Sequence, residues 1–338
     1  MVDAAPDLSA LTRYFEQHVP GFEGTLRVEL INGGRSNLTY LVSGGASRWV
    51  LRRPPFGLVA PTANDVGREF RVVAALGQTP VPVARAVAFC DDLSVLGAPF
   101  SVVSMVDGRV IRSAADGAAL SAGDADRLTT ALVTGLAAIH AIPYQEVGLG
   151  DLGRPIGYLE RQVDRWRRQW ETVATRPLPG IAELHAKLAA AMPLESDATI
   201  VHGDYRLDNT IIDPDDNGIL AAIVDWEMAT LGDPLADLGL LLVYWDPITA
   251  PIMPDGHAIG ANPGFPPVVE VARRYGAISG RSLDNFEFYL AMGYFKLAVI
   301  AEGIHNRFLA GLTVGDGFDT VGQAVAPLVE AGLRVLAP

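Results

Sequence analysis

The sequence predicts an α+β fold in two lobes, an antiparallel β-rich lobe over residues 1–105 and a mostly helical lobe over residues 106–338. Short apolar runs separated by Gly, Asn and Pro fill the first part of the chain, whereas long segments with helical spacing fill most of the second. The length of 338 residues also exceeds the about 250–300 residues at which a single hydrophobic core stops growing.

The first lobe is expected to contain five strands and one helix in the order βββαββ. The strands are predicted at residues 26–31, 38–43, 48–52, 83–89 and 99–106, and the helix at residues 64–76. Glycine-containing turns separate the first three strands, so these strands should form an antiparallel meander. Pro54 and Pro55 end the meander, because proline cannot donate a hydrogen bond to a β-ladder.

The second lobe is predicted to be helical on both sides of a short β-rich insert at residues 200–224. Helical spacing is found at residues 124–140, 156–173 and 177–192, and again from residue 233 to the end, with a late helix at residues 289–309. Residues 246–267 are rich in Pro and Gly, which predicts a loop or lid.

Composition excludes several classes of protein. A hydrophobic fraction of 49% excludes a disordered chain, and the single cysteine, Cys90, excludes a disulfide framework or a cysteine-rich metal site. The net charge of −13 argues against a nucleic-acid partner. No apolar run reaches about 18 residues and Asp3 and Asp7 do not fit a signal peptide, so we expect no membrane partner and a cytoplasmic location. The oligomeric state stays open.

One segment, residues 199–237, carries the candidate chemistry. It contains His202-Gly203-Asp204, then Asn209 five residues after Asp204, then an apolar strand that ends at Asp225. The strands expected at 210–212 and 220–224 flank a turn, and this hairpin should bring Asp204, Asn209 and Asp225 to one edge. Oxygen-bearing side chains that converge in this way suit Mg²⁺.

An Asp, an Asn five residues later and a second Asp after a strand form the arrangement that phosphoryl transfer uses in the kinase fold. Asp204 and Arg206 are the candidate catalytic residues, with Asp204 accepting or orienting the proton of the attacking hydroxyl. Asn209 and Asp225 are the candidate metal ligands. Arg206 either reaches a phosphate or pairs with an acid, and Glu227 either reaches the substrate or the outer shell of the metal, or faces solvent.

These motifs resemble those of aminoglycoside phosphotransferases and choline-kinase-like enzymes. The resemblance is carried by His202-Gly203-Asp204 with Asn209, by Asp225-Trp226-Glu227, and by Gly232-Asp233-Pro234 with Asp237. It covers nearly the whole chain and is nearest to the kinase-like domain fused to some acyl-CoA dehydrogenases. It implies a bilobal protein-kinase-like fold, ATP and Mg²⁺ as cofactors, and a small-molecule hydroxyl as the phosphate acceptor.

The resemblance also implies a loop that folds over the phosphates between the first two strands. The residues at that place are Gly33, Gly34, Arg35, Ser36 and Asn37. Glycine permits close approach of the backbone, and the side chains of Ser36 and Asn37 can donate hydrogen bonds. An ordinary hairpin turn is the alternative interpretation.

The third strand should carry a lysine for the α- and β-phosphates, but Arg52 stands at that place. Arginine still supplies a fixed charge and a bidentate fork for phosphate. Glu69, 17 residues later, is the expected partner of Arg52, although a surface pair with Arg68 is the alternative. The same alignment places the Ser104 carbonyl and the Val106 amide against the adenine edge.

Three further residues near the motif are expected to be structural rather than catalytic. His202 should bond to backbone near the loop, and Asp237 should hold the loop from within the helical lobe. His140, at the end of an apolar helix, should be a packed core residue.

Other functions stay open at this stage. The missing lysine raises the hypothesis of a catalytically weak kinase-fold module that binds nucleotide or ligand without turnover. Protein kinase activity ranks lower, because no A-P-E-like segment follows Asp225. The substrate is either a polycation such as an aminoglycoside or, as the fused branch implies, a hydroxyacyl compound or its coenzyme A thioester, and the choice between ATP and GTP is also open.

Overall fold

The computed structural model describes residues 8–31, 37–55, 65–194, 196–253, 258–313 and 317–337. The chain divides into two compact units. The first comprises Met1–Gly108 and Ala221–Ala229, and the second comprises Arg109–Leu220 and Thr230–Pro338. The predicted lobes, residues 1–105 and 106–338, did not include residues 221–229 in the first part of the molecule. The assignment of the two lobes as separate domains remains a prediction.

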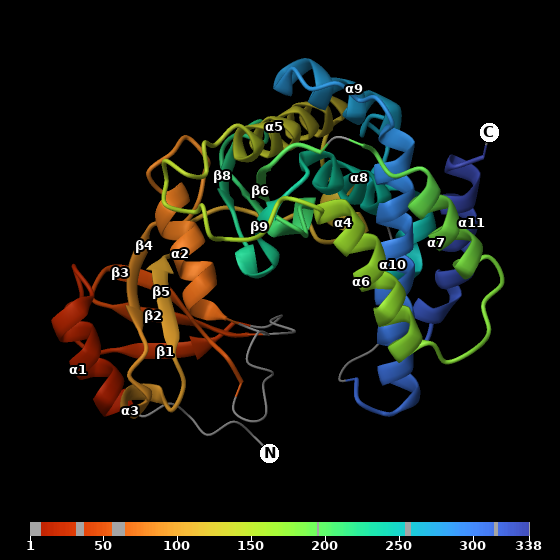
Figure 1. The fold of residues 1–338 in the computed structure, drawn as a ribbon. Coiled ribbons are helices and arrows are strands. Elements are labelled where there is room, and N and C mark those ends of the chain that lie inside the picture. The colour runs from red at the N-terminus through yellow and green to blue at the C-terminus, as the bar shows by residue number, and fades with distance from the viewer. Residues whose placement is uncertain are drawn as a thin grey trace. The chain divides into compact units, whose positions relative to one another are not determined.

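The first unit contains a five-stranded antiparallel sheet in the order β1-β2-β3-β5-β4 (Figure 1). The strands are β1 Arg27–Leu30, β2 Leu38–Gly44, β3 Ser47–Arg53, β4 Ala86–Cys90 and β5 Phe100–Ser104. The helices are α1 Leu8–His18, α2 Val66–Leu76 and the short α3 Leu93–Leu96. The five predicted strands and the predicted helix α2 are confirmed, and the structure adds α1 and α3.

The two faces of this sheet have different roles because side chains alternate along each strand. On β3, Trp49 and Leu51 are buried in the core that Leu11 and Phe15 of α1 complete. Burial of each such side chain contributes about 1.5–3 kcal/mol. Arg52 therefore points to the opposite face, the face from which α2 supplies its partner.

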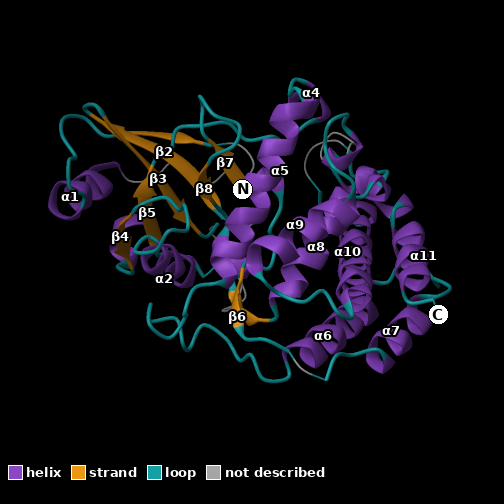
Figure 2. Ribbon diagram, turned by 90° about the horizontal axis from the view of Figure 1, so that it is seen from above, coloured by secondary structure: helices purple, strands orange, loops and turns teal. Residues whose placement is uncertain are grey.

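The second unit is mostly helical. Its helices are α4 Ala114–Ala118, α5 Ala122–His140, α6 Tyr158–Val173, α7 Ile181–Ala190, α8 Pro234–Trp245, α9 Val268–Ser279, α10 Phe286–Leu309 and α11 Val325–Val335. The long helix α10 packs against α6, α7, α8 and α11 (Figures 1 and 2). Its apolar residues lie on every side, which is typical of a helix surrounded by others. Among the described residues, no helix is long and apolar enough to cross a membrane.

Two small sheets form the β-rich insert. The predicted hairpin is confirmed as a two-stranded sheet of β7 (Thr210–Ile212) and β8 (Leu220–Ile223). The second sheet pairs β6 (Thr199–Val201) with β9 (Thr230–Gly232). In this antiparallel pairing Thr199, at the start of β6, lies opposite Gly232, the residue before the N-cap of α8. The loop at the other end of β6 is joined to α8 by Asp237, whose carboxylate accepts backbone N–H groups of that loop.

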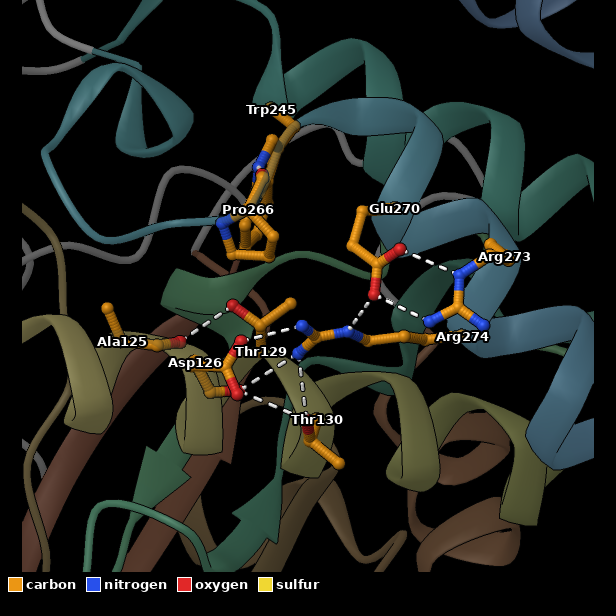
Figure 3. A network of polar contacts seen from close by, with 9 residues as sticks. All are labelled: Ala125, Asp126, Thr129, Thr130, Trp245, Pro266, Glu270, Arg273 and Arg274. Carbon is orange, nitrogen blue, oxygen red and sulfur yellow. Dashed lines mark hydrogen bonds and ion pairs between the residues drawn. The ribbon is translucent and has the colours of Figure 1, made fainter.

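The segment 246–267, predicted as a loop or lid, contains two short 3₁₀ helices, Pro247–Ile252 and Ile259–Ala261. The helix α9, which follows this segment, is joined to α5 (Figure 3). Arg274 of α9 donates to Asp126 of α5 at 2.6 Å and to Glu270 of α9 at 2.9 Å. The indole N–H of Trp245, at the end of α8, donates to the Pro266 carbonyl at 2.9 Å. These contacts hold the segment at both of its ends.

Candidate active site

The backbone of the His-Gly-Asp loop is held by Asp237 of α8. The carboxylate of Asp237 accepts the N–H of His202 at 2.6 Å and the N–H of Gly203 at 2.8 Å. Gly203 has φ 84°, a left-handed conformation that glycine adopts without steric cost. Nδ1 of His202 accepts the N–H of Asp204 at 3.3 Å. The expected structural roles of His202 and Asp237 are thus confirmed.

Behind Asp237 lies His140, which is 2% exposed. Its Nε2 is 3.4 Å from the Asp237 carboxylate, and its Nδ1 is 2.7 Å from the hydroxyl of Tyr275. Burial lowers the pKa of His140. Burial alone would raise the pKa of Asp237, but its hydrogen bonds with His140 and with the Gly203 N–H lower it. A neutral imidazole beside a carboxylate must donate from Nε2, so Nδ1 accepts from Tyr275. His140 is the buried core residue that the sequence predicted.

Asp204 and Asn209 lie together in the second unit, as the spacing predicted. The side-chain N–H₂ of Asn209 donates to the Asp204 carbonyl at 2.9 Å and to its carboxylate at 3.2 Å. The Asp204 side chain is 27% exposed, so solvent or a substrate can reach it. Because its nitrogen faces Asp204, the Asn209 amide keeps its oxygen as the atom that can ligate a cation.

The guanidinium of Arg206 lies between two carboxylates. Its guanidinium is 3.3 Å from Asp204 and 3.0 Å from Asp208, and it stacks over the ring of Tyr244 at 5.1 Å. Burial raises the pKa of Asp208, against the opposing effect of Arg206. Of the two interpretations of Arg206, pairing with acids is therefore observed, and one of those acids is the candidate base.

A small pocket with a cavity volume of about 40 Å³, partly open to solvent, adjoins Arg206. The described residues that line it are Ile111, Arg112, Ser113, Arg206, Leu207, Asp208, Leu241, Tyr244, Trp245, Met253 and Ile259. Its walls are mostly apolar, and its charged side chains are two arginines and one aspartate. The lining therefore combines apolar surface with more positive than negative charge.

In the first unit, Arg52 is surrounded by carboxylates. Its guanidinium donates to Glu69 at 2.5 Å and to Asp225 at 3.2 Å, and it lies 4.0 Å from Glu227. Burial opposes the charge of Arg52, but Glu69, Asp225 and Glu227 together raise its pKa. The predicted Arg52–Glu69 pair is therefore present, and Asp225 and Glu227 join it.

This cluster has an excess of negative charge, three carboxylates against one guanidinium. Burial raises the pKa of Glu69 to about 7, and Asp225 and Glu227 add to the rise. The buried Nε of Arg52 and Oε2 of Glu69 meet no hydrogen-bond partner among the described residues. A cationic metal and a phosphate oxygen would satisfy these groups, so the residues present fit a bound metal–nucleotide complex.

No group of three or more His, Cys, Asp or Glu within the described part of the chain is arranged to hold a metal ion. Mg²⁺ is typically bound by one or two carboxylates, with substrate phosphates and water as the remaining ligands.

The backbone positions Asp225 toward Arg52. Asp225 has φ 67°, in the left-handed region where Asp is tolerated better than most residues. It is followed by the 3₁₀ helix Trp226–Met228, and the indole of the buried Trp226 donates to the Ile223 carbonyl at 2.9 Å. The N–H of Ile223 donates to the Pro82 carbonyl at 2.7 Å, which fastens this segment to the first unit.

Other predicted site residues are less defined. Gly33, Gly34, Arg35 and Ser36 lie outside the described residues. Ser104 donates its N–H to the Arg85 carbonyl at 2.9 Å and accepts the N–H of Arg85 at its hydroxyl, and Val106 is half-buried. Asp204 and Asn209 belong to the second unit and Asp225 to the first, so their convergence at one edge stays a prediction.

The charges of the late helix, Lys296 among them, gave no role from the sequence, and one contact of this helix with the site was not predicted. Lys296 of α10 donates to the carbonyl of Gly203 at 2.6 Å. A signal was available, because Lys296 is a lone charge in the otherwise apolar stretch 288–301. Its distance of 93 residues from Gly203 gave no indication of the contact.

Solved structures with the same architecture identify the fold class as kinase-like. A protein from Ralstonia eutropha, provisionally assigned as an aminoglycoside phosphotransferase, superposes with a TM-score of 0.85 at 32% identity and 98% coverage of both chains. A thermostable mutant of aminoglycoside phosphotransferase APH(4)-Ia, in complex with ADP and hygromycin B, gives 0.64 at 15% identity, covering 97% of this chain and 98% of that one. At that identity the second likeness supports the fold alone.

The sequence profile of the phosphotransferase enzyme family matches residues 27–268. The chain therefore belongs to the phosphotransferase enzyme family. It is 34% identical over 337 residues to acyl-CoA dehydrogenase family member 11 of Homo sapiens, covering 97% of this chain and 43% of that protein. It is 33% identical over 304 residues to family member 10 of Mus musculus, covering 88% and 28%. The chain thus spans less than half the length of these relatives.

Proposed function

We propose that this kinase-like phosphotransferase uses ATP and Mg²⁺ to transfer the γ-phosphate to a hydroxyl group of a small molecule. The observation that carries the proposal is the position of Arg52 between Glu69 and Asp225. A guanidinium fork suits phosphate oxygens, and the surplus of carboxylates around it suits a divalent cation.

On the nucleotide side, Arg52 binds the α- and β-phosphates and Glu69 fixes its direction. The loop that ends at Asn37 covers the phosphates, and the Ser104 carbonyl and Val106 amide contact the adenine edge. Bound Mg²⁺ supplies neutralisation of charge on the phosphates. The residues that would hold it are Asn209, through its amide oxygen, and Asp225, through its carboxylate.

On the acceptor side, Asp204 accepts the proton of the attacking hydroxyl or orients that hydroxyl. A positioned base of this kind contributes about 10²–10⁴-fold to the rate. Arg206, in contact with Asp204, offsets negative charge near the acceptor. Most of the remaining acceleration comes from positioning and electrostatic stabilisation.

For the acceptor, we favour a hydroxyacyl compound over a polycation. The pocket has apolar walls, and its one lining carboxylate, Asp208, is paired with Arg206. Arg112 adds a further positive charge to the lining. An aminoglycoside would need unpaired acids there, whereas an acyl chain with an anionic group matches the lining. Glu227, 4.0 Å from Arg52, is proposed to reach the substrate or the outer shell of the metal.

The test is acceptor-dependent formation of ADP with Mg²⁺, in wild type and in Asp204→Asn. Hydroxyacyl compounds, their coenzyme A thioesters and aminoglycosides are compared, with ATP and with GTP. We expect turnover in wild type and a loss of about 10²–10⁴-fold in Asp204→Asn. Asp213→Asn is the matched control, because its side chain caps the turn at Asp215 and Asp216 and its amide oxygen can keep those bonds.

Two outcomes would contradict the proposal. Equal formation of ADP by wild type and Asp204→Asn would remove Asp204 from the chemistry. Nucleotide binding without any acceptor-dependent turnover would favour a kinase-fold binding module. Turnover with aminoglycosides alone would leave the phosphotransferase in place but overturn the acyl acceptor.

A further inference from the structure

Lys296 is a half-buried cation in the middle of the apolar helix α10. Its ammonium donates to the carbonyl of Gly203 at 2.6 Å and lies 5.6 Å from the ring centre of Trp166 of α6. Burial lowers the pKa of Lys296, and the carboxylates of Asp204 and Asp237 oppose that effect. Burying the charge of a lysine at such a position costs free energy unless the charge is paired or hydrogen-bonded. An apolar residue at the same position would pack without that cost.

The contact reaches the peptide bond that joins Gly203 to Asp204. A peptide unit is planar, so its orientation is fixed when both of its polar ends are bound. The carbonyl end, on Gly203, is bound by Lys296. The N–H end, on Asp204, is bound by His202 at 3.3 Å. The direction in which the Asp204 side chain leaves the backbone follows from the plane of this peptide.

Asp237 alone does not fix that plane. Its carboxylate takes the N–H groups of His202 and Gly203, which belong to the two preceding peptide units. Without Lys296, the Gly203 carbonyl could rotate together with the N–H of Asp204, because Gly203 tolerates a wide range of backbone angles. Lys296 therefore restrains the part of the loop that Asp237 leaves free.

We infer that Lys296 is a positioning residue for Asp204, acting through the Gly203 carbonyl and held in place by Trp166. The inference rests on the proposed function, in which Asp204 receives the acceptor hydroxyl. Lys296 also places a positive charge near Asp204. Its loss should affect the chemical step more than nucleotide binding, because Arg52 and Glu69 belong to the other unit.

The experiment compares Lys296→Met and Lys296→Arg with wild type in the acceptor-dependent ADP assay. Methionine keeps the apolar stem and removes the donor and the charge. A misplacement of about 1 Å costs about 10²-fold in rate, so we expect kcat to fall about 10–100-fold in Lys296→Met. The KM for nucleotide should change less than about twofold, because a loss that acts only in the transition state lowers kcat without changing KM. Lys296→Arg, which keeps donors and charge, should recover a substantial part of the lost kcat.

Glu302→Gln is the matched control on the same helix. Glu302 is fully buried and accepts the N–H and hydroxyl of Thr175 at 2.9 and 2.5 Å, and it pairs with Arg176. Its substitution should lower the melting temperature without the selective loss of kcat. If Lys296→Met fails to fold, Lys296→Gln, which keeps a polar end but no charge, takes the same measurements.

The outcomes separate the two proposals. Active wild type, inactive Asp204→Asn and fully active Lys296→Met would overturn the role of Lys296 and leave the proposed function intact. A loss in Lys296→Met that raises the KM for nucleotide and is matched by Glu302→Gln would also overturn it, because that pattern indicates general destabilisation. Wild type without acceptor-dependent turnover would overturn the proposed function, and the role of Lys296 with it.

Discussion

The guanidinium of Arg52 donates a 2.5 Å hydrogen bond to Glu69, and both side chains are largely buried. The planar guanidinium of Arg52 binds Glu69 with one nitrogen and Asp225 with another. A lysine has a single nitrogen and cannot reproduce this geometry. The arginine at this position therefore links the helix α2 to the Asp-Trp-Glu segment within the first unit.

Arg52→Met should weaken nucleotide binding while the fold survives. The carboxyl of Glu69, whose pKa is already raised to about 7, can take up a proton when its cation is lost. A charged hydrogen bond contributes about 1.5–3 kcal/mol, so KM for ATP should rise at least about tenfold. Arg52→Lys should show a smaller rise, because it keeps the charge and one contact.

Arg48→Met, on the same strand but in an exposed pair with Asp107, is the control. An unchanged KM in Arg52→Met would remove Arg52 from the phosphate site.

Asp225→Asn should separate activity from stability. The substitution keeps a residue that tolerates the left-handed backbone at this position and removes one of three crowded carboxylates. We expect an unchanged or slightly higher melting temperature, together with loss of turnover at any Mg²⁺ concentration tested. Asp225→Ala should lose turnover too, but should also lower the free energy of unfolding by about 1–2 kcal/mol, because alanine is strained there. Full activity in Asp225→Asn would argue against a metal at this carboxylate.

The pair of His140 and Asp237 predicts a pH dependence of stability. Burial lowers the pKa of His140 from its ordinary value of 6.5, so below pH 6.5 the unfolded chain binds a proton that the folded chain does not. The free energy of unfolding should therefore fall as the pH falls from 6.5 toward 5. Glu69 acts in the opposite direction, because its raised pKa makes the folded chain bind more protons between its ordinary 4.5 and about 7.

His140→Gln isolates the histidine. Glu69 is present in both proteins, so its contribution cancels when the two unfolding curves are subtracted. Chemical unfolding at pH 7, 6 and 5 should show a shallower fall for the variant than for wild type. Parallel curves would mean that His140 is protonated equally in the folded and unfolded chain.

The sequence was sufficient wherever the relevant residues lie close together or on a regular strand. The resemblance to kinase-like phosphotransferases, which carry a lysine–glutamate pair, located Arg52 and Glu69, and the interval of five residues placed Asn209 beside Asp204. The helix α1 was missed although Leu11 and Phe15 are four residues apart, because this short helix acquires its stability from packing on the sheet.

Contacts over long sequence separations could not be predicted. Tyr275 reaches His140 across 135 residues, and Tyr244 stacks on Arg206 from a helix that the sequence marks only as buried. Neither contact has a local signature, since both depend on how α5, α8 and α9 pack. The segment 221–229 returns to the first unit for the same reason, through a hydrogen bond to Pro82 and the cluster at Arg52.

Arg112→Glu should reveal the charge of the acceptor. Arg112 is exposed at the lining of the pocket, and a reversal of its charge changes the field there without disturbing a buried contact. For an anionic acceptor, KM should rise about five- to tenfold, which corresponds to about 1 kcal/mol for charges near a protein surface. For a polycationic acceptor, KM should fall by a similar factor.

Both effects on the KM of the acceptor should shrink in 0.5 M salt, because screening weakens interactions between exposed charges. The KM for ATP should be the same in wild type and Arg112→Glu. A fall in KM for every active acceptor would contradict the hydroxyacyl assignment, and identical KM values at low and high salt would show that Arg112 does not face the bound acceptor.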